Sequence, residues 1–314
     1  MDAEKENPRT EVFLAVDSDS GAEGAASLPS KLARYGEARR KALQMQSFAE
    51  GAGHVKEAVK LSGCANYLLF RHYYTVDKVR LHAASFCKKH LLCPMCAIRR
   101  GAKMLRAYLE KYEAVRQQGG QHLRPYLVTL TVKNGEDLDE RLRHLRSAMR
   151  KMTVARRGHI SNPKKNRFVE FARSMGGFHS IEVTNKGQGW HPHVHMIWLC
   201  ASEPSQEALK AEWHSWTGDS FIVDCRPLHD PVEGFMEVCK YALKFSDLEP
   251  ADNWHAYAVM AGQRLIDSHG LMRGVEIPDS LLDEPLEGLP YLHLFYRYFP
   301  GKGYSYIPNE FPSR

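Results

Sequence analysis

The spacing of apolar and polar positions predicts a series of helices along the chain. Between residues 31 and 60, apolar residues recur at intervals of three and four, which is the pattern of one or two amphipathic helices. Residues 98–117 and 138–157 show the same period, and the second of these segments is strongly basic. Residues 203–216 and 232–245 predict two further helices.

Between these helices lie short runs rich in β-branched and aromatic residues, which is the composition of strands. The clearest runs are residues 124–132 (RPYLVTLTV), 178–184 and 193–200. The last two are joined by NKGQGWHP, whose glycine and proline content suits a hairpin loop. Strands joined by hairpins and helices in this order predict an α+β fold, with a central antiparallel β-sheet flanked by helices. Shorter strand-like runs occur at residues 67–70, 79–81, 221–226 and 291–298.

The same pattern divides the chain into four parts. Residues 1–30 are rich in Ala, Ser, Gly and Glu, have no sustained period, and predict a disordered tail. Residues 31–120 are expected to form a helical and cysteine-rich module, and residues 121–248 carry the predicted sheet. Residues 249–314 have weaker periodicity, and we expect them to form a C-terminal extension that packs on this core.

Composition excludes several broad classes of protein. A hydrophobic fraction of 43% is enough to build a core, so the chain as a whole is not expected to be disordered. No apolar run approaches the roughly 18 residues that span a bilayer, and the amino terminus lacks a basic segment followed by an apolar one. The 7 cysteines are clustered and odd in number, which favours reduced thiols and metal over disulfides. We therefore expect a soluble cytoplasmic protein without a membrane partner.

The net charge of +6 conceals an uneven distribution. Residues 31–245 hold 36 Lys and Arg against 20 Asp and Glu, whereas residues 1–30 and 246–290 are acidic. A basic block between acidic ones is typical of a polyanion-binding surface, although a solvated helix face can be equally basic. Nucleic acid is the first partner that this pattern indicates. The candidate DNA contacts are Arg99, Arg100, Arg156, Arg157, Lys164 and Lys165.

The sharpest chemical signal is the pair His193 and His195 in a predicted strand. Side chains alternate faces along a strand, so both imidazoles lie on the same side and can bind one divalent ion. Glu182, on the neighbouring strand of the hairpin, is a third candidate ligand, because an unpaired carboxylate would be costly to bury among β-branched residues. His179 is the weaker candidate. The alternative is a pair of partly buried histidines bonded to the backbone.

The predicted helix over residues 232–245 places Glu237, Tyr241 and Lys244 on one face. A phenol with an ordinary pKa of about 10 is a poor nucleophile at neutral pH and needs help. A lysine one turn away favours the phenolate and holds a phosphate, and a carboxylate one turn earlier activates water or accepts a proton. The alternative is an amphipathic surface tyrosine flanked by charged residues.

The cysteines predict a second metal site. Cys93 and Cys96 have the C-x₂-C spacing of zinc ligands, and Cys87 lies just upstream. Either Cys64 or His90 completes a closed, tetrahedral Zn²⁺ site. Simple buried free cysteines are the alternative reading.

Three ordered motifs resemble those of the rolling-circle replication initiators of small bacterial plasmids. These proteins belong to the HUH superfamily of endonucleases, named for histidine-hydrophobic-histidine. Residues 126–131 (YLVTLT) are similar to the first-strand motif, residues 190–195 to the metal motif, and residues 240–244 (KYALK) to the tyrosine motif. The resemblance extends over residues 86–100 and spans about residues 60–248.

The resemblance implies a fold and a mechanism. The expected core is an HUH endonuclease sheet of ferredoxin or RRM-like type. Mg²⁺ or Mn²⁺ on His193, His195 and Glu182 would polarise a phosphodiester, which Tyr241 attacks to give a 5′-phosphotyrosyl intermediate and a 3′-OH primer. Lys244 would stabilise the phosphate, and Glu237 would direct the terminating hydrolysis, as in single-tyrosine initiators. The resemblance also favours Cys64 over His90 as the fourth structural zinc ligand.

The partner implied is single-stranded or hairpin origin DNA in a bacterial cytoplasm. A host helicase and a polymerase are candidate further partners, and an oligomer is compatible with the sequence. The alternative functions are an HUH transposase or relaxase, a non-catalytic zinc-containing DNA-binding regulator, and a metallohydrolase of a small substrate. The last leaves the basic central region unexplained.

Overall fold

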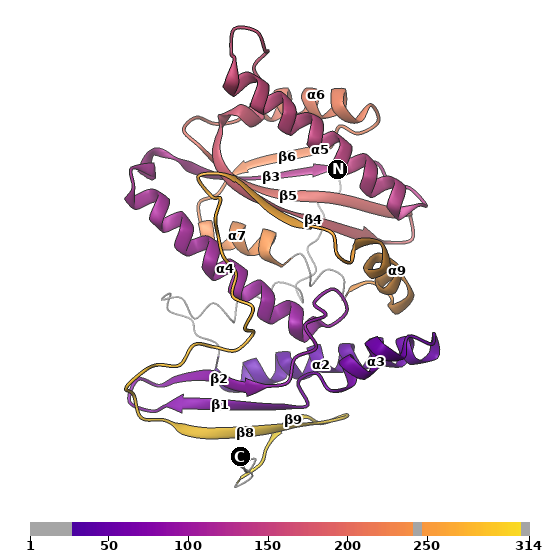
Figure 1. Ribbon diagram of the computed structural model, residues 1–314, viewed down its shortest axis with the longest axis vertical. Coiled ribbons are helices and arrows are strands. Elements are labelled where there is room, and N and C mark those ends of the chain that lie inside the picture. The colour runs from indigo at the N-terminus through magenta and orange to yellow at the C-terminus, as the bar shows by residue number, and fades with distance from the viewer. Residues whose placement is uncertain (1–26, 241–246, 309–314) are drawn as a thin grey trace. The chain divides into compact units, whose positions relative to one another are not determined.

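The computed structural model describes residues 27–240 and 247–308, and the chain divides into two compact units. One unit contains the chain through Lys103 together with residues 249–253 and the segment from Ile277 onward. The second unit contains residues 104–248 and 254–276. Each unit is built around its own antiparallel sheet (Figure 1).

The first unit combines two helices with a four-stranded sheet of order β2-β1-β8-β9. Every pair of neighbouring strands is antiparallel, and β8 joins residues near the C-terminal end to the β1–β2 hairpin. α2 begins with Pro29 near its amino end, where the missing N–H of proline costs no helical hydrogen bond. The elements are α2 (Leu28–Gly51), α3 (Val55–Ser62), β1 (Tyr67–Tyr73), β2 (Lys78–Ala84), β8 (Leu292–Phe299) and β9 (Gly303–Tyr306).

The second unit is built on a five-stranded sheet of order β6-β3-β5-β4-β7. The helix α4 (Pro94–Gln117) begins in the first unit and ends in the second. The strands are β3 (Arg124–Thr131), β4 (Ser174–Asn185), β5 (Trp190–Cys200), β6 (Val223–Pro227) and β7 (Ile266–Gly270). The helices are α5 (Leu138–Ser161), α6 (Gln206–Thr217) and α7 (Pro231–Cys239), with short 3₁₀ turns η1 (Gly120–His122) and η2 (Glu170–Arg173); α9 (Pro250–Met260) has its first residues in the first unit and the rest in the second.

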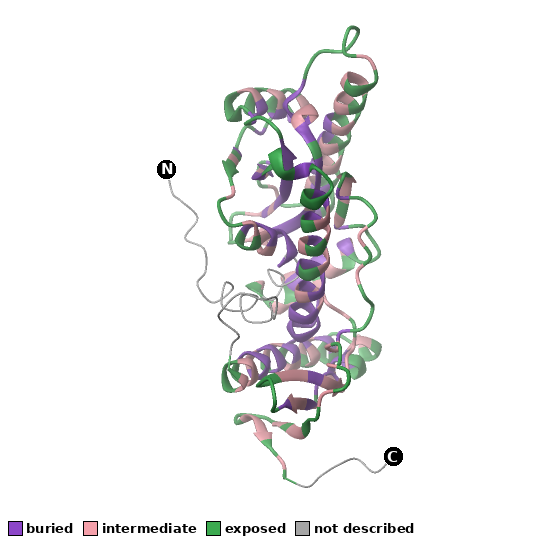
Figure 2. Cartoon of the chain, turned by 90° about the vertical axis from the view of Figure 1, so that its left-hand side faces the viewer, coloured by how far each residue is buried: buried purple, intermediate pink, exposed green. Residues whose placement is uncertain are grey.

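The central strand β5 is buried along nearly its whole length because helices cover both faces of this sheet. α5 packs on β5, and the ring of Trp198 stacks on Phe171 of η2 at 4.9 Å between centroids. On the other face, Phe178 of β4 meets the ring of Phe235 from α7 at 5.1 Å. Figure 2 shows the buried residues gathered on the strands and on the helix sides turned toward them. The apolar positions of the sequence are thus buried on both faces of β5.

The α+β fold class is confirmed, with antiparallel sheets flanked by helices. The predicted helices over 98–117 and 138–157 correspond to α4 and α5, and the hairpin of 178–184 and 193–200 corresponds to β4 and β5. The weakly periodic part of the chain holds α9 and β7, which the sequence pattern did not predict.

The C-terminal segment differs from expectation. We expected residues 249–314 to pack on the predicted core; β7 of this segment extends the sheet of that core, whereas β8 and β9 complete the sheet that β1 and β2 begin. The reason is long-range strand pairing, since a local pattern shows that a strand forms and not which partner it takes. The four-part division of the chain otherwise stays a prediction.

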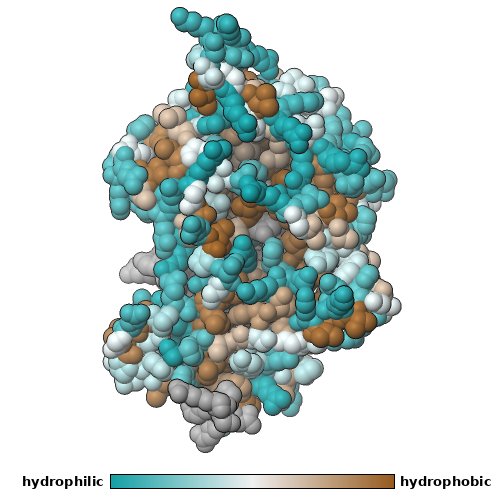
Figure 3. Space-filling model, in the orientation of Figure 1, coloured by the Kyte–Doolittle hydropathy of each residue, from teal (hydrophilic) through white to brown (hydrophobic). Residues whose placement is uncertain are grey.

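The surface that Figure 3 presents is mainly hydrophilic, with apolar residues scattered in small groups. Within residues 27–240 and 247–308, no helix combines the length and the apolar character that crossing a bilayer requires.

Candidate functional site

Adjacent strands of the second unit bring Glu182, His193 and His195 together. β4 and β5 pair so that Glu182 lies directly opposite His193, and Ser180 lies opposite His195. The period of two along β5 directs both imidazoles to one face of the sheet, as the sequence predicted. All three side chains are buried, with Glu182 0% exposed.

The three side chains converge on a single point. The Oε2 atom of Glu182 lies 3.3 Å from Nε2 of His193 and 3.5 Å from Nε2 of His195. One ligand atom from each residue lies within 4.8 Å of the others, so the group has the dimensions of a metal site. Burying a carboxylate without exposure is costly unless its charge is compensated, and a cation held between these atoms would supply that compensation.

The other ring nitrogens of the two histidines have protein partners. Nδ1 of His195 lies 3.0 Å from Oγ1 of Thr129 on β3, and Nδ1 of His193 donates to the backbone oxygen of His191 at 3.3 Å. These contacts hold the rings in place with each Nε2 atom facing Glu182, which is the arrangement that metal-binding histidines use. The donor set of two imidazoles and one carboxylate therefore fits a divalent ion with open coordination positions.

α7 brings a second carboxylate to this group. Asp230 caps the helix by accepting from the N–H of Val232, and Phe235 docks it on the sheet. Oε1 of Glu237 lies 3.6 Å from Nε2 of His195, and its other oxygen pairs with Nζ of Lys240. Glu237 is thus part of the same cluster as the histidines. Tyr241 and Lys244, the predicted nucleophile and phosphate-binding lysine, lie outside the described residues.

Sequence reasoning missed two members of this site. Thr129, which orients His195, lies inside the first-strand motif, and its role follows from the direct pairing of Thr129 with His195 across β3 and β5. Lys240, which is buried and paired with Glu237, belongs to the KYALK motif, but the sequence assigns it no role. Its spacing of three residues from Glu237 on a helix is the signal that identifies the pair. His179, the weaker candidate ligand, is not part of the group that converges on Glu182.

Four cysteines form a separate cluster in the first unit. The sulfur of Cys64 lies 3.5 Å from that of Cys93 and 3.6 Å from that of Cys96, and Cys87 lies 3.6 Å from Cys96. The cluster includes Cys64 and not His90. Hydrogen bonds from Cys64, Cys93 and Cys96 lower the pKa of Cys87, whereas contacts with Cys64 and burial raise the pKa of Cys93 and Cys96. Four thiols at one point fit a closed structural zinc site.

The loops that carry this cluster have unusual backbone. Ala65 and Lys88, which directly follow Cys64 and Cys87, have positive φ of 53° and 57°. A non-glycine residue adopts this left-handed conformation only at a cost, which surrounding contacts must offset. The backbone N–H of Cys87 donates to the sulfur of Cys64 at 3.4 Å, so the loops converge on the thiols.

The candidate DNA contacts differ in exposure. Arg99 is only 4% exposed, donates to the backbone oxygen of Leu281 at 2.7 Å, and pairs with Asp283. Arg99 is therefore committed to the core of the first unit, and we remove it from the predicted DNA surface. Arg156 is half-buried and donates to two backbone oxygens. Arg100 is half-buried, whereas Arg157, Lys164 and Lys165 are exposed.

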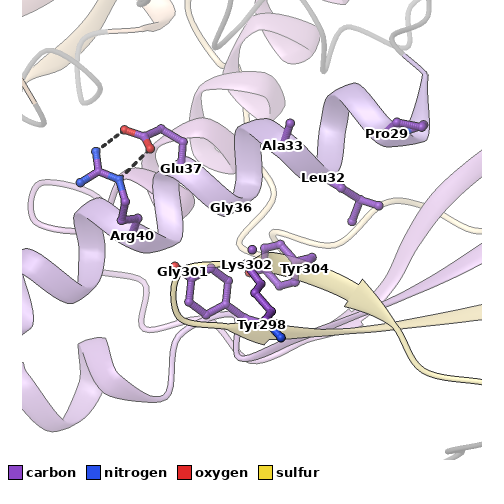
Figure 4. A pocket seen from close by; sticks show the side chains of 11 residues that line it. Pro29, Leu32, Ala33, Gly36, Glu37, Arg40, Tyr298, Gly301, Lys302 and Tyr304 are labelled. Atoms are coloured by element: carbon purple, nitrogen blue, oxygen red, sulfur yellow. Dashed lines mark hydrogen bonds and ion pairs between the residues drawn. The ribbon is translucent and has the colours of Figure 1, made fainter.

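The first unit also contains a hollow of about 490 Å³, which is lined by other residues than the two candidate metal groups. It lies between the amino-terminal half of α2 and the β8–β9 turn, as Figure 4 shows. Its rim carries the ion pair of Glu37 and Arg40, and its floor carries Tyr298 and Tyr304. None of the candidate metal ligands lines it.

The chain is similar in sequence to a family of known proteins. The sequence model of the Rep_1 family, described as "Replication protein", matches residues 78–288. A "Protein rep" of a Bacillus species is 32% identical over 186 residues, which are 56% of this chain and 55% of that protein. A "Protein rep" of Bacillus amyloliquefaciens is 30% identical over 239 residues, which are 73% of this chain and 65% of that protein. The match thus covers less than two thirds of either relative. No solved structure matches the chain.

Proposed function

The chain belongs to the Rep_1 family of replication proteins, and from this premise we propose that it initiates rolling-circle plasmid replication by nicking one DNA strand at the origin. The observation that carries the proposal is the convergence of Glu182, His193 and His195 beside Glu237. Glu237 lies near the end of α7, and Tyr241 comes two residues after the last residue of that helix in the sequence. Tyr241 is therefore the proposed nucleophile for a phosphodiester bound at the histidines.

In the proposed cleavage step, the phenol oxygen of Tyr241 forms a bond to phosphorus as the bond from phosphorus to the 3′ oxygen breaks. The proton that the phenol loses is balanced by the one that the leaving 3′ oxygen gains. The products are a 5′-phosphotyrosyl enzyme and a 3′-OH end that primes synthesis. Mg²⁺ or Mn²⁺ held by Glu182, His193 and His195 would offset the charge that develops on the phosphate oxygens.

Glu237 is proposed to act at the end of the cycle. Its carboxylate contacts both His195 and Lys240, so it is held close to the reacting phosphate and its charge is balanced. There it would accept a proton from the water that hydrolyses the phosphotyrosyl bond. Lys244 would bind the phosphate. These roles also account for strand transfer, in which a DNA 3′-OH replaces the water.

The proposed substrate is single-stranded or hairpin origin DNA. Arg100, Arg156, Arg157, Lys164 and Lys165 are the proposed phosphate contacts, with the four cysteines and Zn²⁺ holding the first unit together. The basic segment of residues 141–173, which has eleven Lys and Arg and only Glu170 as an acidic residue, supports a polyanion partner. A host helicase and polymerase would act on the primed strand.

The test is trapping of the covalent intermediate. The protein is incubated with labelled single-stranded origin DNA and Mg²⁺ or Mn²⁺ and then denatured, and a DNA-linked band is expected on the gel. Tyr241→Phe removes this band while DNA binding survives. Tyr257→Phe on α9 is the matched control, because it removes a phenol oxygen from the same unit and should leave the band intact. A band that persists in Tyr241→Phe rejects the assignment of the nucleophile.

Glu237→Gln separates cleavage from release. We expect the band to form at nearly the normal rate and to accumulate, because hydrolysis of the phosphotyrosyl bond is slowed. Tight duplex binding with no adduct under any condition would instead favour the zinc-containing regulator. Cleavage of transposon ends in preference to a plasmid origin would favour a transposase or relaxase.

A further inference from the structure

The four-stranded sheet of the first unit has two unlike faces. Leu68 and Phe70 of β1 and Leu81 of β2 are buried on one face, where the ring of Phe70 meets that of Tyr296 at 6.0 Å. Their neighbours along each strand point the other way, since side chains alternate. We call this second face the outer face. Leu69 and Tyr73 are buried on it, and the ring of Tyr73 meets that of Tyr291, so we define its accessible part by Tyr67, Arg71, His82, His293, Phe295 and Arg297.

Strand pairing places these six residues in neighbouring rows. Tyr67 lies opposite Arg297, and Arg71 lies opposite His293. Arg297 is exposed and the other members of the outer face are half-buried. Side chains in such rows are about 5 Å apart across the strands, which is the spacing that lets flat groups lie side by side on a sheet.

The flat groups of the outer face form stacked pairs. The rings of Tyr67 and Phe295 lie 5.8 Å apart at an interplanar angle of 26°. The imidazoles of His82 and His293 lie 5.9 Å apart at 22°. The guanidinium of Arg71 lies 3.1 Å from Nε2 of His82 and above the ring of Tyr291. The face thus presents a series of π surfaces and a planar cation.

The charge of this sheet is of one sign. Within the described strands β1, β2, β8 and β9 there is no aspartate or glutamate, whereas Arg71, Arg80 and Arg297 are present. Partial burial, with the neighbouring Arg71 as a further cause, lowers the pKa of His82 and of His293. The imidazoles are therefore held neutral, which suits them to stacking, while the guanidiniums keep the face positive.

We propose that the outer face binds single-stranded DNA by stacking unpaired bases on Tyr67 and Phe295 while Arg71 and Arg297 contact the phosphates. Planar rings on a half-exposed antiparallel sheet, mixed with arginines and with no carboxylate in the described strands, match what an unpaired strand offers. A duplex hides the base faces, so it cannot use these rings. The inference rests on the proposed function and adds a second contact between the protein and the nicked or extruded strand.

The experiment measures affinity for a short fluorescein-labelled oligothymidylate by anisotropy, with the full-length zinc-loaded chain and no added divalent ion. Tyr67→Leu with Phe295→Leu keeps the sheet apolar and removes both planes. We expect affinity to fall by about tenfold to a hundredfold, since stacking on an aromatic ring contributes strongly for each base. Duplex affinity is expected to change less than threefold.

The matched control is Tyr306→Leu, an exposed aromatic of the same sheet whose pairing with Tyr296 places it on the opposite face. It should leave oligothymidylate affinity unchanged. Zinc content and the unfolding temperature of each variant show that the first unit is folded. Photo-crosslinking with an iodouracil-substituted strand should label a peptide that contains Tyr67 or Phe295.

Arg297→Gln supplies an independent readout. Loss of one phosphate contact should lower the slope of log affinity against log salt by about 0.7 on a single strand. Unchanged affinity in the double variant, with crosslinks elsewhere, overturns the proposal. A double variant that binds DNA normally but loses self-association assigns the face to a second copy instead. The adduct test at Tyr241 is scored separately, so failure of the cleavage proposal and failure of this one are distinguishable.

Discussion

The two candidate metal groups of this protein are built in opposite ways. Cys64, Cys87 and Cys93 lie on loops beside the helices and strands of the first unit, and only Cys96 lies in the first turn of α4. Glu182, His193 and His195 lie in the middle of paired strands, where the sheet holds the backbone with or without a metal. The thiol group is therefore expected to need its ion for folding, whereas the histidine group is expected to be preformed.

The two groups also differ in their ligands, and this difference again indicates a structural role for the cysteines and a reactive role for the histidines. Four thiolates close a tetrahedral shell and leave no position for substrate. Two imidazoles and a carboxylate leave positions open, and Glu237 and Lys240 stand beside them. Residue type and backbone setting together therefore distinguish a group suited to a structural ion from a group suited to an ion that binds substrate.

The largest effect is expected from Cys93→Ser. Serine is a poor zinc ligand, so the site should lose its ion and with it a folding contribution on the order of 10 kcal/mol. Metal analysis should show loss of about one Zn²⁺ per chain, and thermal unfolding should shift steeply downward. Cys225→Ser is the control, because Cys225 is half-buried and outside the cluster. Retention of zinc and of the normal unfolding temperature in Cys93→Ser would contradict the closed site.

His195→Gln should abolish chemistry and spare the fold. Loss of a ligand beside the reacting phosphate is expected to lower cleavage of single-stranded origin DNA by about a thousandfold. The strands remain paired, so unfolding temperature and DNA affinity should change little. His214→Gln, an exposed position on α6, is the control. If His195→Gln lost its folded structure as well as its activity, the histidine group would also be needed for folding, and the proposed difference between the two metal groups would be wrong.

Thr129→Val tests whether the orientation of His195 matters. Valine keeps the shape of threonine and deletes the oxygen that lies 3.0 Å from Nδ1 of His195. Removal of such a partner typically costs tenfold to a hundredfold in metal affinity or activity. Thr131→Val is the matched control, because its hydroxyl donates to the backbone oxygen of Ile222. Equal activity of the two variants would show that Thr129 plays no part in positioning the ring.

The smallest effect concerns acid stability of the second unit. Burial, and then the nearby Arg156, lower the pKa of His269 from 6.5 to about 3. The folded state therefore binds a proton less readily than the unfolded state. This contribution is fully present above pH 6.5 and is lost progressively as the pH falls toward 3, at about 1.4 kcal/mol per pH unit.

Urea unfolding at pH 7.5 and 5.5 measures this effect. The free energy of unfolding of wild-type protein should fall by about 1.4 kcal/mol more than that of His269→Gln over this interval. Glutamine has no titration in the range and can keep a bond to Ser174, whose hydroxyl contacts His269 at 2.8 Å. Parallel pH dependence in the two proteins would mean that His269 titrates normally.

Much of the fold followed from local pattern. The basic helix α5 and the hairpin of β4 and β5 were predictable because each depends on periodicity within a short stretch. β7 was not predicted because it is short and has few apolar positions, and α9 was not predicted because its apolar positions are not gathered on one side of the helix. The common sheet of β1 and β8 was also missed, since pairing across more than two hundred residues leaves no trace in either strand alone.

The candidate site shows the same division. His193 and His195 share one strand, and Cys93 and Cys96 share one C-x₂-C unit, so sequence alone determined that each pair can bind one ion. Only the tertiary structure decided that Glu237 reaches His195, that Thr129 orients it, and that Arg99 is buried against Asp283. The physical reason is the distance along the chain over which each interaction acts. Covalent spacing determines which side chains share an element, whereas strand register and helix docking, set by burial over the whole unit, determine which elements meet.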